Sequence, residues 1–461
     1  MTIAVVGGGI TGLAAARRLE SLLPDADVVL LEQETRLGGK ILTQRFDGFV
    51  VEGAPDSFLS RKERGVGLCE ELGLAGELVG RRPENARTFV RIGHELHPLP
   101  SGLTGMIPAD LDALTGSSLL SDEGRARLAA EADLPPAPAG GDESIAEFVT
   151  RRLGREAYER IVEPLMTGIY GGDGYELSLE ATYPNLRALE LENGSVLRGL
   201  LAHPTEEGGA RPPFLTLRPG MDTLVSQLVG ELARTELRVA SPARAVRQRP
   251  EGGYMVELQD GETLQADGVV VATPAFATAG LLAELDCELA ALHAEIPYAS
   301  SAIVTLAYRL EDVGRPLDGY GYVVPRTEGS DVLACTWTSS KWEGRAPAGL
   351  ALIRVYVGRF GQQDVTAELD AALLELARDE VRILDVFAEP VLHRVYRWPR
   401  GMPQYVLGHT GRVERIETAL ERHPGLALAG AAYRGVGIPD CIASGERAAE
   451  SVARSLAGAL R

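Results

Sequence analysis

Ile3-Ala4-Val5-Val6-Gly7-Gly8-Gly9-Ile10-Thr11-Gly12 decides the fold, because an apolar strand here runs through a glycine-rich turn into a helix. The first glycine of the motif allows a tight turn, the second lets the backbone approach a pyrophosphate, and the third lets the helix pack on the strand. The helix, from Leu13 to Leu22, then points its N-terminus at the phosphate charge. A second apolar strand, Val28–Leu31, leads to Glu32, twenty residues after Gly12, where a carboxylate can accept hydrogen bonds from ribose hydroxyls. A glycine-rich turn without a ligand is the alternative for the motif alone, but this context predicts a dinucleotide-binding domain.

The length of the chain limits the number of domains, and its net charge limits the kind of partner that it can bind. The chain has 461 residues, which predicts two or three domains, and 45% of them are hydrophobic, as in ordinary globular proteins. The formal net charge of −19 argues against nucleic acid as a partner, because phosphate contacts need clustered Lys and Arg. An anionic substrate would therefore need a local basic patch.

Targeting signals and cysteine chemistry are also readable. No apolar run approaches the roughly 18 to 20 residues of a membrane span, and the first residues carry no basic leader or cleavage site. We therefore expect a cytoplasmic protein with no integral membrane segment. The four cysteines lie far apart, which predicts reduced thiols, and no cysteine or histidine cluster has metal-ligand spacing, so no metal site is predicted.

Two further glycine-rich stretches favour FAD over NAD. Arg36-Leu37-Gly38-Gly39-Lys40 follows the ribose carboxylate and suits a long cofactor that runs across the sheet. Near the other end, the strand Leu426–Ala429 leads into a glycine-rich turn that contains Gly430 and Gly435-Val436-Gly437-Ile438. Backbone amides in this turn could lie against a flavin ring, and the following helix, expected from about Ser444, could stabilise charge near it.

The remaining pattern predicts an α/β (α+β overall) fold with a Rossmann-like FAD-binding domain that is interleaved with two other parts. Residues 298–360 alternate with period two, which predicts an antiparallel sheet for a substrate-binding domain, and residues 105–190 are expected to be mostly helical. The predicted limits are 1–80, 214–290 and 396–461 for the FAD-binding domain, 81–104, 191–213 and 291–395 for the substrate-binding domain, and 105–190 for the helical insertion.

Several motifs give the chain its resemblance to the protoporphyrinogen/coproporphyrinogen oxidase family of monoamine-oxidase-like flavoproteins. They span nearly the whole chain and include Glu52-Gly-Ala-Pro-Asp-Ser-Phe58, Gly168-Ile-Tyr-Gly-Gly-Asp173, Met402-Pro-Gln-Tyr405 and Tyr433-Arg-Gly-Val-Gly-Ile-Pro-Asp-Cys441. The stretch Pro55–Lys62 is similar to the branch that acts on coproporphyrinogen III in Gram-positive-type haem synthesis. Gly172 and Ala431-Ala432 depart from the common pattern of the family and leave the width of the substrate pocket open.

The resemblance implies FAD-dependent oxidation of coproporphyrinogen III to coproporphyrin III, a six-electron reaction with O₂ as acceptor and H₂O₂ as product. It implies that the hydride acceptor is flavin N5, so that positioning matters more than an acid or base, and no catalytic side chain is named. FAD is expected to be bound non-covalently, because the terminal motif has no cysteine except Cys441, which lies three residues past Ile438 and is followed by a helix. The predicted cofactor-binding residues are Gly7, Gly9, Ile10, Thr11, Gly12, Glu32, Gln33, Arg36, Gly38, Gly39, Lys40, Gly53, Ala54, Pro55, Asp56, Ser57, Ala245, Val246, Ala272, Thr273, Trp398, Gly430, Val436, Gly437 and Ile438.

Substrate contacts are expected at two places. Arg61 and Lys62 follow the segment that faces the flavin, and Gly168, Ile169, Tyr170 and Gly171 are expected to form a wall of the porphyrinogen slot. A solvated basic face and a turn between two helices are the alternatives for these two stretches. Four more arginines crowd the next segment and carry a weaker expectation of substrate contact: Arg81, Arg82, Arg87 and Arg91.

Other functions stay open at this point. Protoporphyrinogen IX oxidation is the nearest, and an amine oxidase, a carotenoid desaturase-like enzyme or a non-catalytic flavin-binding protein of the haem pathway are further alternatives. We expect the porphyrinogen and O₂ as small-molecule partners and a haem-pathway enzyme as a protein partner. The sequence does not decide substrate preference, oligomeric state, peripheral membrane contact or regulation by haem.

Overall fold

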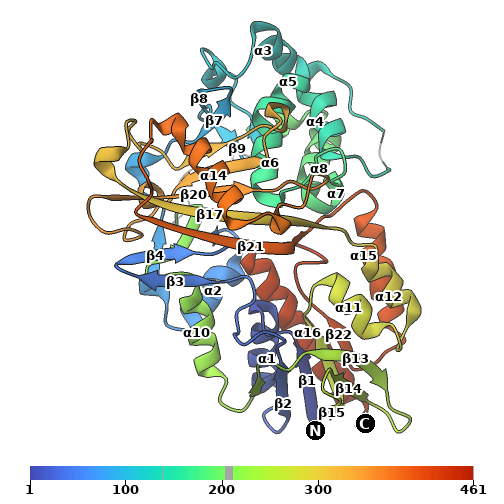
Figure 1. The fold of residues 1–461 in the computed structure, drawn as a ribbon. Coiled ribbons are helices and arrows are strands. Elements are labelled where there is room, and N and C mark those ends of the chain that lie inside the picture. Colours follow the sequence, from blue (N-terminus) through green and yellow to red (C-terminus); the bar gives the residue numbers. More distant parts are fainter. Residues whose placement is uncertain (139, 203–210, 460–461) are drawn as a thin grey trace.

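The computed structural model describes residues 1–138, 140–202 and 211–459. Figure 1 shows the parallel sheet and both termini at one end of the molecule, long antiparallel strands across its middle, and a group of helices at the other end. Part of the stretch 191–213, which was assigned to the substrate-binding domain, lies outside the described residues. Within the described part of the chain, we find no helix with the length and hydropathy needed to span a bilayer.

Five parallel strands form the dinucleotide-binding sheet in the order β12-β2-β1-β16-β22. They come from distant parts of the chain: β1 (Thr2–Val6), β2 (Asp27–Leu31), β12 (Glu236–Arg238), β16 (Gly268–Val271) and β22 (Leu426–Leu428). Side chains of β1 alternate between two hydrophobic clusters, one on each face of the sheet. A sheet that is covered on both faces explains why the strands read as continuous apolar runs. The predicted interleaved, Rossmann-like fold is confirmed.

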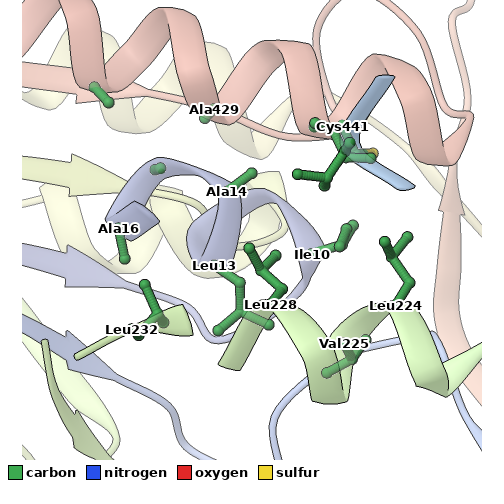
Figure 2. Packing of buried hydrophobic residues seen from close by; sticks show 14 of the residues in the cluster. Ile10, Leu13, Ala14, Ala16, Leu224, Val225, Leu228, Leu232, Ala429 and Cys441 are labelled. Carbon is green, nitrogen blue, oxygen red and sulfur yellow. The ribbon is translucent and has the colours of Figure 1, made fainter. Parts of the chain in front are cut away.

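Helix α1 (Ile10–Leu22) packs between α10 (Asp222–Glu231) and α16 (Ile438–Ala459) on one face of this sheet. Figure 2 shows Ile10 and Leu13 of α1 among Leu224, Leu228 and Cys441 from the other two helices. The α1–α16 crossing is so close that an added Cβ at Gly445 would collide with the Thr11 carbonyl oxygen. This crossing brings the last glycine-rich turn of the chain beside the first.

The expected start of the last helix, near Ser444, is wrong, because α16 begins at Ile438. The glycines before it suggested a longer loop. Pro439 stands at the second helical position, where its missing N–H group costs nothing. Asp440 accepts a hydrogen bond from the Gly437 amide at 3.2 Å, which satisfies a free donor at this helix end.

The middle layer is a seven-stranded sheet in the order β21-β17-β20-β19-β18-β7-β8, with antiparallel pairing except between β18 and β7. Its strands are β7 (Phe89–Ile92), β8 (Glu95–Pro98), β17 (Tyr298–Arg309), β18 (Gly321–Val323), β19 (Val332–Trp337), β20 (Leu350–Val357) and β21 (Leu392–Pro403). The antiparallel sheet expected over 298–360 is thus present. The expected limit between the substrate-binding and FAD-binding domains, at residue 396, falls inside β21. The domain limits stay a prediction.

The third part covers the residues 105–190 that were expected to be mostly helical, and it begins with a short hairpin of β9 (Leu103–Thr104) and β10 (Ile107–Pro108). Its helices are α3 (Asp122–Ala129), α4 (Ile145–Leu153), α5 (Arg155–Ala157), α6 (Glu163–Tyr170), α7 (Leu179–Thr182), α8 (Pro184–Asn193) and α9 (Val196–Ala202). Helix α9 shares the hydrophobic cluster of the other helices, so this packing unit extends past the expected limit at 190.

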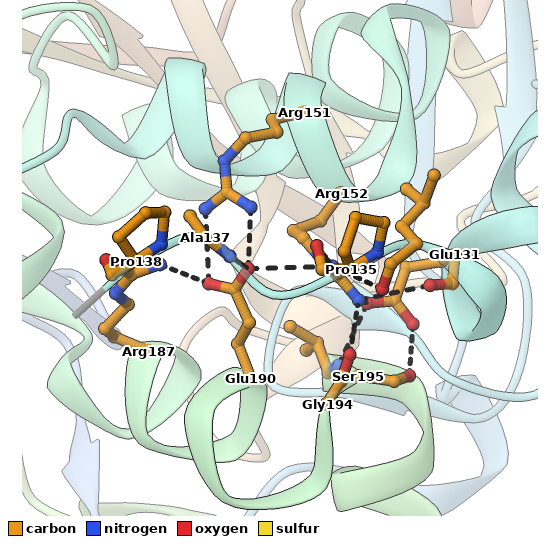
Figure 3. Close-up of polar contacts among 12 residues, drawn as sticks. Glu131, Pro135, Ala137, Pro138, Arg151, Arg152, Arg187, Glu190, Gly194 and Ser195 are labelled. Carbon is orange, nitrogen blue, oxygen red and sulfur yellow. Dashed lines mark hydrogen bonds and ion pairs between the residues drawn. The ribbon is translucent and has the colours of Figure 1, made fainter.

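A buried ionic network joins these helices (Figure 3). The side chains of Glu131 and Arg152 are both 0% exposed, and Arg152 Nε donates to Glu131 Oε1 at 2.7 Å. The same oxygen accepts from the backbone N–H of Val196 at 2.9 Å, which ties α9 to the network. Glu190 of α8 accepts from Arg151 at 2.6 Å. Burial raises the pKa of Glu190, but the hydrogen bonds from Arg151, the Ala137 amide and Arg187 outweigh it and lower the pKa to about 2.

We predict that Arg152→Met destabilises the helical part by about 3–5 kcal/mol, because it leaves the buried Glu131 charge without its cation. Arg155→Ala is the matched control, since the Arg155 side chain is 70% exposed and lies 3.5 Å from Glu159; its expected cost is under ~0.5 kcal/mol. Urea unfolding followed by far-ultraviolet circular dichroism measures both. Equal losses in the two variants would contradict the role of the buried pair.

Candidate active site

A continuous cavity of about 3500 Å³ runs from the dinucleotide-binding sheet past the seven-stranded sheet to the helices. Most of the predicted cofactor-binding residues line it: Gly7, Gly9, Ile10, Thr11, Glu32, Gln33, Arg36, Gly38, Gly39, Lys40, Ala54, Pro55, Asp56, Ser57, Ala272, Thr273, Trp398, Gly430, Val436, Gly437 and Ile438. Four of them do not line it: Gly12, Gly53, Ala245 and Val246. Ala243 and Arg244, which precede Ala245 and Val246 on strand β13 (Ala243–Gln248), do line the cavity. This strand therefore reaches the cavity two residues earlier than expected.

The turn at Gly7–Gly12 forms one end of the cavity and suits a pyrophosphate. Gly7 has φ +109°, which favours glycine, and an added Cβ at Gly12 would collide with the Gly7 carbonyl oxygen. Gly12 therefore serves the helix–strand contact, as the motif predicts, and need not face a ligand. No described side chain caps α1 at Gly9, so the first N–H groups of the helix are free to bind an anion.

Glu32 lies at the end of β2 with its carboxylate against the glycine turn. Its two oxygens accept from the backbone N–H groups of Gly8 at 2.7 Å and Glu34 at 2.8 Å. Each oxygen keeps a lone pair for a further donor. The carboxylate thus fixes the turn and still lines the cavity, where a ribose hydroxyl could reach it.

The second glycine motif packs directly on the first. The Gly38 amide donates to the Gly8 carbonyl at 2.8 Å, and an added Cβ at Gly39 would lie 3.1 Å from the Gly9 Cα. Arg36 donates to the Gly39 and Ile41 carbonyls and so holds this loop closed. The two motifs together shape one wall for the middle of a long cofactor.

Side chains of the seven-stranded sheet and the short helix α13 (Thr338–Lys341) fix the segment 53–57. Trp398 donates to the Gly53 carbonyl at 2.9 Å, and Arg354 donates to the Ala54 carbonyl. The buried Asp56 carboxylate accepts from Lys341 at 2.9 Å and from Trp342 at 3.1 Å. Burial raises the pKa of Asp56, but the Lys341 and Arg354 charges outweigh it and hold the pKa well below its usual range.

Lys341, Trp342 and Arg354 are residues that sequence reasoning missed. They lie 285 to 300 positions from their partners in the segment 53–57. No spacing in the sequence links such distant positions. A lysine next to a tryptophan in a short polar stretch was the available signal, and it is too common to indicate a site.

The Met402–Tyr405 motif connects the flavin-type turn to helix α6. Tyr405 donates to the Ala431 carbonyl and accepts from the Gly435 amide, both at 2.7 Å. Gln404 donates to the Tyr170 carbonyl at 2.9 Å, at the end of α6. An added Cβ at Gly172 would lie 2.5 Å from Gln404 Oε1, so this departure from the family pattern fits the local packing.

The predicted substrate residues all line the same cavity. Gly168, Ile169 and Tyr170 form the last turn of α6, and Gly171 ends the helix with φ +60°; they are not a turn between two helices. Ile169 is 50% exposed, and an added Cβ at Gly168 would have its nearest neighbour at 3.8 Å, so this wall leaves room. Lys62 forms an ion pair with Asp440 of α16.

The cavity wall is basic although the protein is acidic. Among the described residues that line it, eleven are Lys or Arg and five are Asp or Glu, against a formal net charge of −19 for the whole chain. The basic residues are Arg36, Lys40, Arg61, Lys62, Arg81, Arg87, Arg211, Arg244, Lys341, Arg397 and Arg400. This local surplus of positive charge suits an anionic cofactor and an anionic substrate in one space.

Cys441 also lines the cavity, and the four cysteines are free. Burial raises the pKa of the Cys441 thiol to about 11. The thiol is therefore neutral near pH 7 and a weak nucleophile. This supports a cofactor that is held without a covalent bond.

Comparison with known proteins agrees with this geometry. Residues 10–453 match the flavin-containing amine oxidoreductase family. The coproporphyrinogen III oxidase of Bacillus subtilis is 35% identical over 97% of this chain and 96% of its own length, and that of Staphylococcus aureus is 32% identical over 99% of both. The crystal structure of a putative protoporphyrinogen oxidase from Exiguobacterium superposes with a TM-score of 0.88 at 34% identity and covers 98% of both chains.

The family match and these full-length relatives confirm the resemblance that the sequence motifs indicated. The glycine turn, the free N-terminus of α1 and Glu32 fit the FAD that the family uses. The chain therefore belongs to the flavin-containing amine oxidoreductase family and is an FAD-dependent oxidoreductase of its porphyrinogen-oxidising branch.

Proposed function

We propose that this enzyme oxidises coproporphyrinogen III to coproporphyrin III in haem biosynthesis, with O₂ as the electron acceptor and H₂O₂ as the product. The observation that carries the proposal is the single cavity that joins the FAD motifs to a basic wall in an otherwise acidic protein. The names of the B. subtilis and S. aureus relatives supply the substrate class. A haem-pathway enzyme that takes up the porphyrin is the partner that this function calls for.

Bound FAD supplies a two-electron acceptor. The α1 N-terminus would hold its pyrophosphate, and Glu32 would accept from its ribose. The segments 53–57 and 436–438 would flank its ring, since Trp398, Arg354 and Lys341 fix the first and Tyr405 fixes the turn before the second. These contacts hold the cofactor site rigid before any substrate enters.

The substrate end of the cavity needs to position a large ring more than to move protons. The bridging carbons of a porphyrinogen are activated by the flanking pyrroles, so correct placement supplies much of the catalysis. The end of α6 gives an apolar wall through Ile169 and an open place at Gly168. Cations that line the same cavity, Arg61 among them, would bind the carboxylates and set which bridge faces the cofactor.

Protoporphyrinogen IX oxidation is the second candidate, and the Exiguobacterium relative's name favours it. At two positions of the ring, coproporphyrinogen III carries propionates and protoporphyrinogen IX carries vinyl groups. A basic wall favours the ring with more carboxylates. The same charge argues against an amine oxidase, because a protonated amine would be repelled.

We predict a kcat/KM for coproporphyrinogen III at least about 10-fold above that for protoporphyrinogen IX, the worth of one charge-assisted hydrogen bond. Porphyrin fluorescence and peroxide release in air measure both reactions with the same FAD-loaded protein. Equal or reversed rates would move the function to protoporphyrinogen IX. Silence with both rings would remove the porphyrinogen proposal while leaving the family assignment intact.

We further predict that Glu32→Ala weakens FAD binding about 10- to 100-fold, because it removes acceptors for the Gly8 amide and for the ribose. Glu236→Gln is the control, since Glu236 lies on edge strand β12 and pairs with Arg238 outside the cavity. FAD titration of the stripped proteins gives the two Kd values. Removal of FAD should also lower Tm in the parent protein, since a ligand stabilises the state that binds it. Unchanged affinity in Glu32→Ala would refute the assigned role of Glu32.

A further inference from the structure

The structure separates the four arginines that crowd residues 81–91. Three of them form ion pairs: Arg82 with Glu84 at 2.8 Å, Arg87 with Asp318 at 2.6 Å and Arg91 with Glu380 at 3.0 Å. Arg81 lines the cavity and has no carboxylate within ion-pair distance among the described residues. It is half-buried, so this charge is partly removed from water without a protein partner.

Two aromatic rings hold the Arg81 side chain in place. Its guanidinium carbon lies 4.6 Å from the ring centroid of Phe214 and 4.6 Å from that of Tyr320. Phe214 begins β11 (Phe214–Leu217), and Tyr320 is fixed by a hydrogen bond from its hydroxyl to the Arg82 carbonyl at 2.9 Å. A guanidinium that lies over two aromatic rings loses little freedom when a ligand arrives.

The N–H groups of Arg81 are available. No hydrogen bond formed among the described residues uses them, and the cavity lies in front of the side chain. The guanidinium carbon lies over both aromatic rings, and the N–H groups project in the plane of the guanidinium. A planar fork of this kind matches a carboxylate with two parallel hydrogen bonds.

The charges around Arg81 also call for an anion. The Arg82 amide donates to the Lys341 carbonyl at 3.1 Å, so the Arg81 segment packs against the helix that carries Lys341. Asp56 is already engaged by Lys341, by Trp342 and by Ser57, and Arg354 lies 3.6 Å from it. The Asp56 carboxylate is therefore already engaged by two cations, Lys341 and Arg354, and burial lowers the pKa of Arg81 despite the charges of Tyr320 and Asp56.

We propose that Arg81 binds a carboxylate of the porphyrinogen and is a specificity-determining residue of this enzyme. The inference rests on the proposed function. A phosphate of FAD is the other anion with the same chemistry. The glycine turn and the α1 N-terminus already supply a phosphate site on the parallel sheet, whereas Arg81 follows β6 (Leu78–Gly80), which pairs with β11 outside that sheet.

The test compares three variants of the FAD-loaded enzyme: Arg81→Gln, Arg81→Lys and Arg82→Gln. We expect Arg81→Gln to raise KM for coproporphyrinogen III about 10- to 100-fold, the loss of a charge-assisted hydrogen bond, with little change in kcat. Arg81→Lys keeps the charge but not the fork and should recover part of the loss. Arg82→Gln is the matched control, since Arg82 is the next residue, pairs with Glu84 and does not line the cavity.

Flavin content and Tm of each variant accompany the kinetics. An unchanged KM in Arg81→Gln, or an equal rise in Arg82→Gln, would overturn the proposal. Loss of FAD from Arg81→Gln with normal KM in the remaining holoenzyme would assign Arg81 to the cofactor instead. A fall in kcat alone would point to a structural role and would equally overturn it.

A binding experiment keeps this inference separate from the proposed reaction. Fluorescence titration of coproporphyrin III into the oxidised parent protein and the variants needs no turnover. If the parent oxidises neither porphyrinogen, the proposed function fails. The Arg81 inference would still be supported by binding that Arg81→Gln weakens about 10-fold or more and Arg82→Gln does not. Equal binding of coproporphyrin III by the parent protein, Arg81→Gln and Arg82→Gln would reject the Arg81 inference.

Discussion

The buried carboxylate of Asp56 is the interaction on which both halves of the cavity depend. Its segment follows the glycine motifs, whereas its partners, Lys341 and Trp342, are the last residue of helix α13 and the residue after it, between β19 and β20 of the seven-stranded sheet. Together with the hydrogen bonds from Trp398 to Gly53 and from Arg354 to Ala54, this ion pair fixes the segment 53–57 against the seven-stranded sheet. The same cluster carries more positive than negative charge, which leaves Arg81 free to act on a ligand. We propose that one buried electrostatic arrangement sets both the cofactor geometry and the recognition of substrate.

The contrast between the acidic protein and its basic cavity shapes the function. A net charge of −19 gives the surface long-range repulsion toward anions, and the positive wall reverses this only inside. Under the proposed function, a substrate would thus be selected at short range, by carboxylates that reach particular arginines. A tetracarboxylate ring gains from such a wall, a neutral polyene gains nothing, and a protonated amine is repelled.

The sequence predicted much of the fold and many residues that line the cavity near the glycine motifs, because these depend on local patterns. Strand, glycine turn, helix and acidic residue follow one another within 32 residues at the N-terminus, and each has a physical signature. The start of α16 was misplaced, since glycines that serve a ligand turn resemble a loop. The partners of Asp56 and the singular position of Arg81 were not predictable. They depend on side chains from 231 to 300 positions away, such as Asp318 for Arg87 and Arg354 for the segment 53–57.

The central claim is that one cavity brings FAD and a carboxylate-rich porphyrinogen together. Anaerobic mixing of the FAD-loaded protein with coproporphyrinogen III, with the visible absorbance of the flavin followed in a stopped-flow instrument, tests it most directly. The account predicts rapid loss of the oxidised flavin spectrum, a rate that saturates with substrate concentration, and reoxidation when air is admitted. A flavin that stays oxidised at every concentration of coproporphyrinogen III would contradict it.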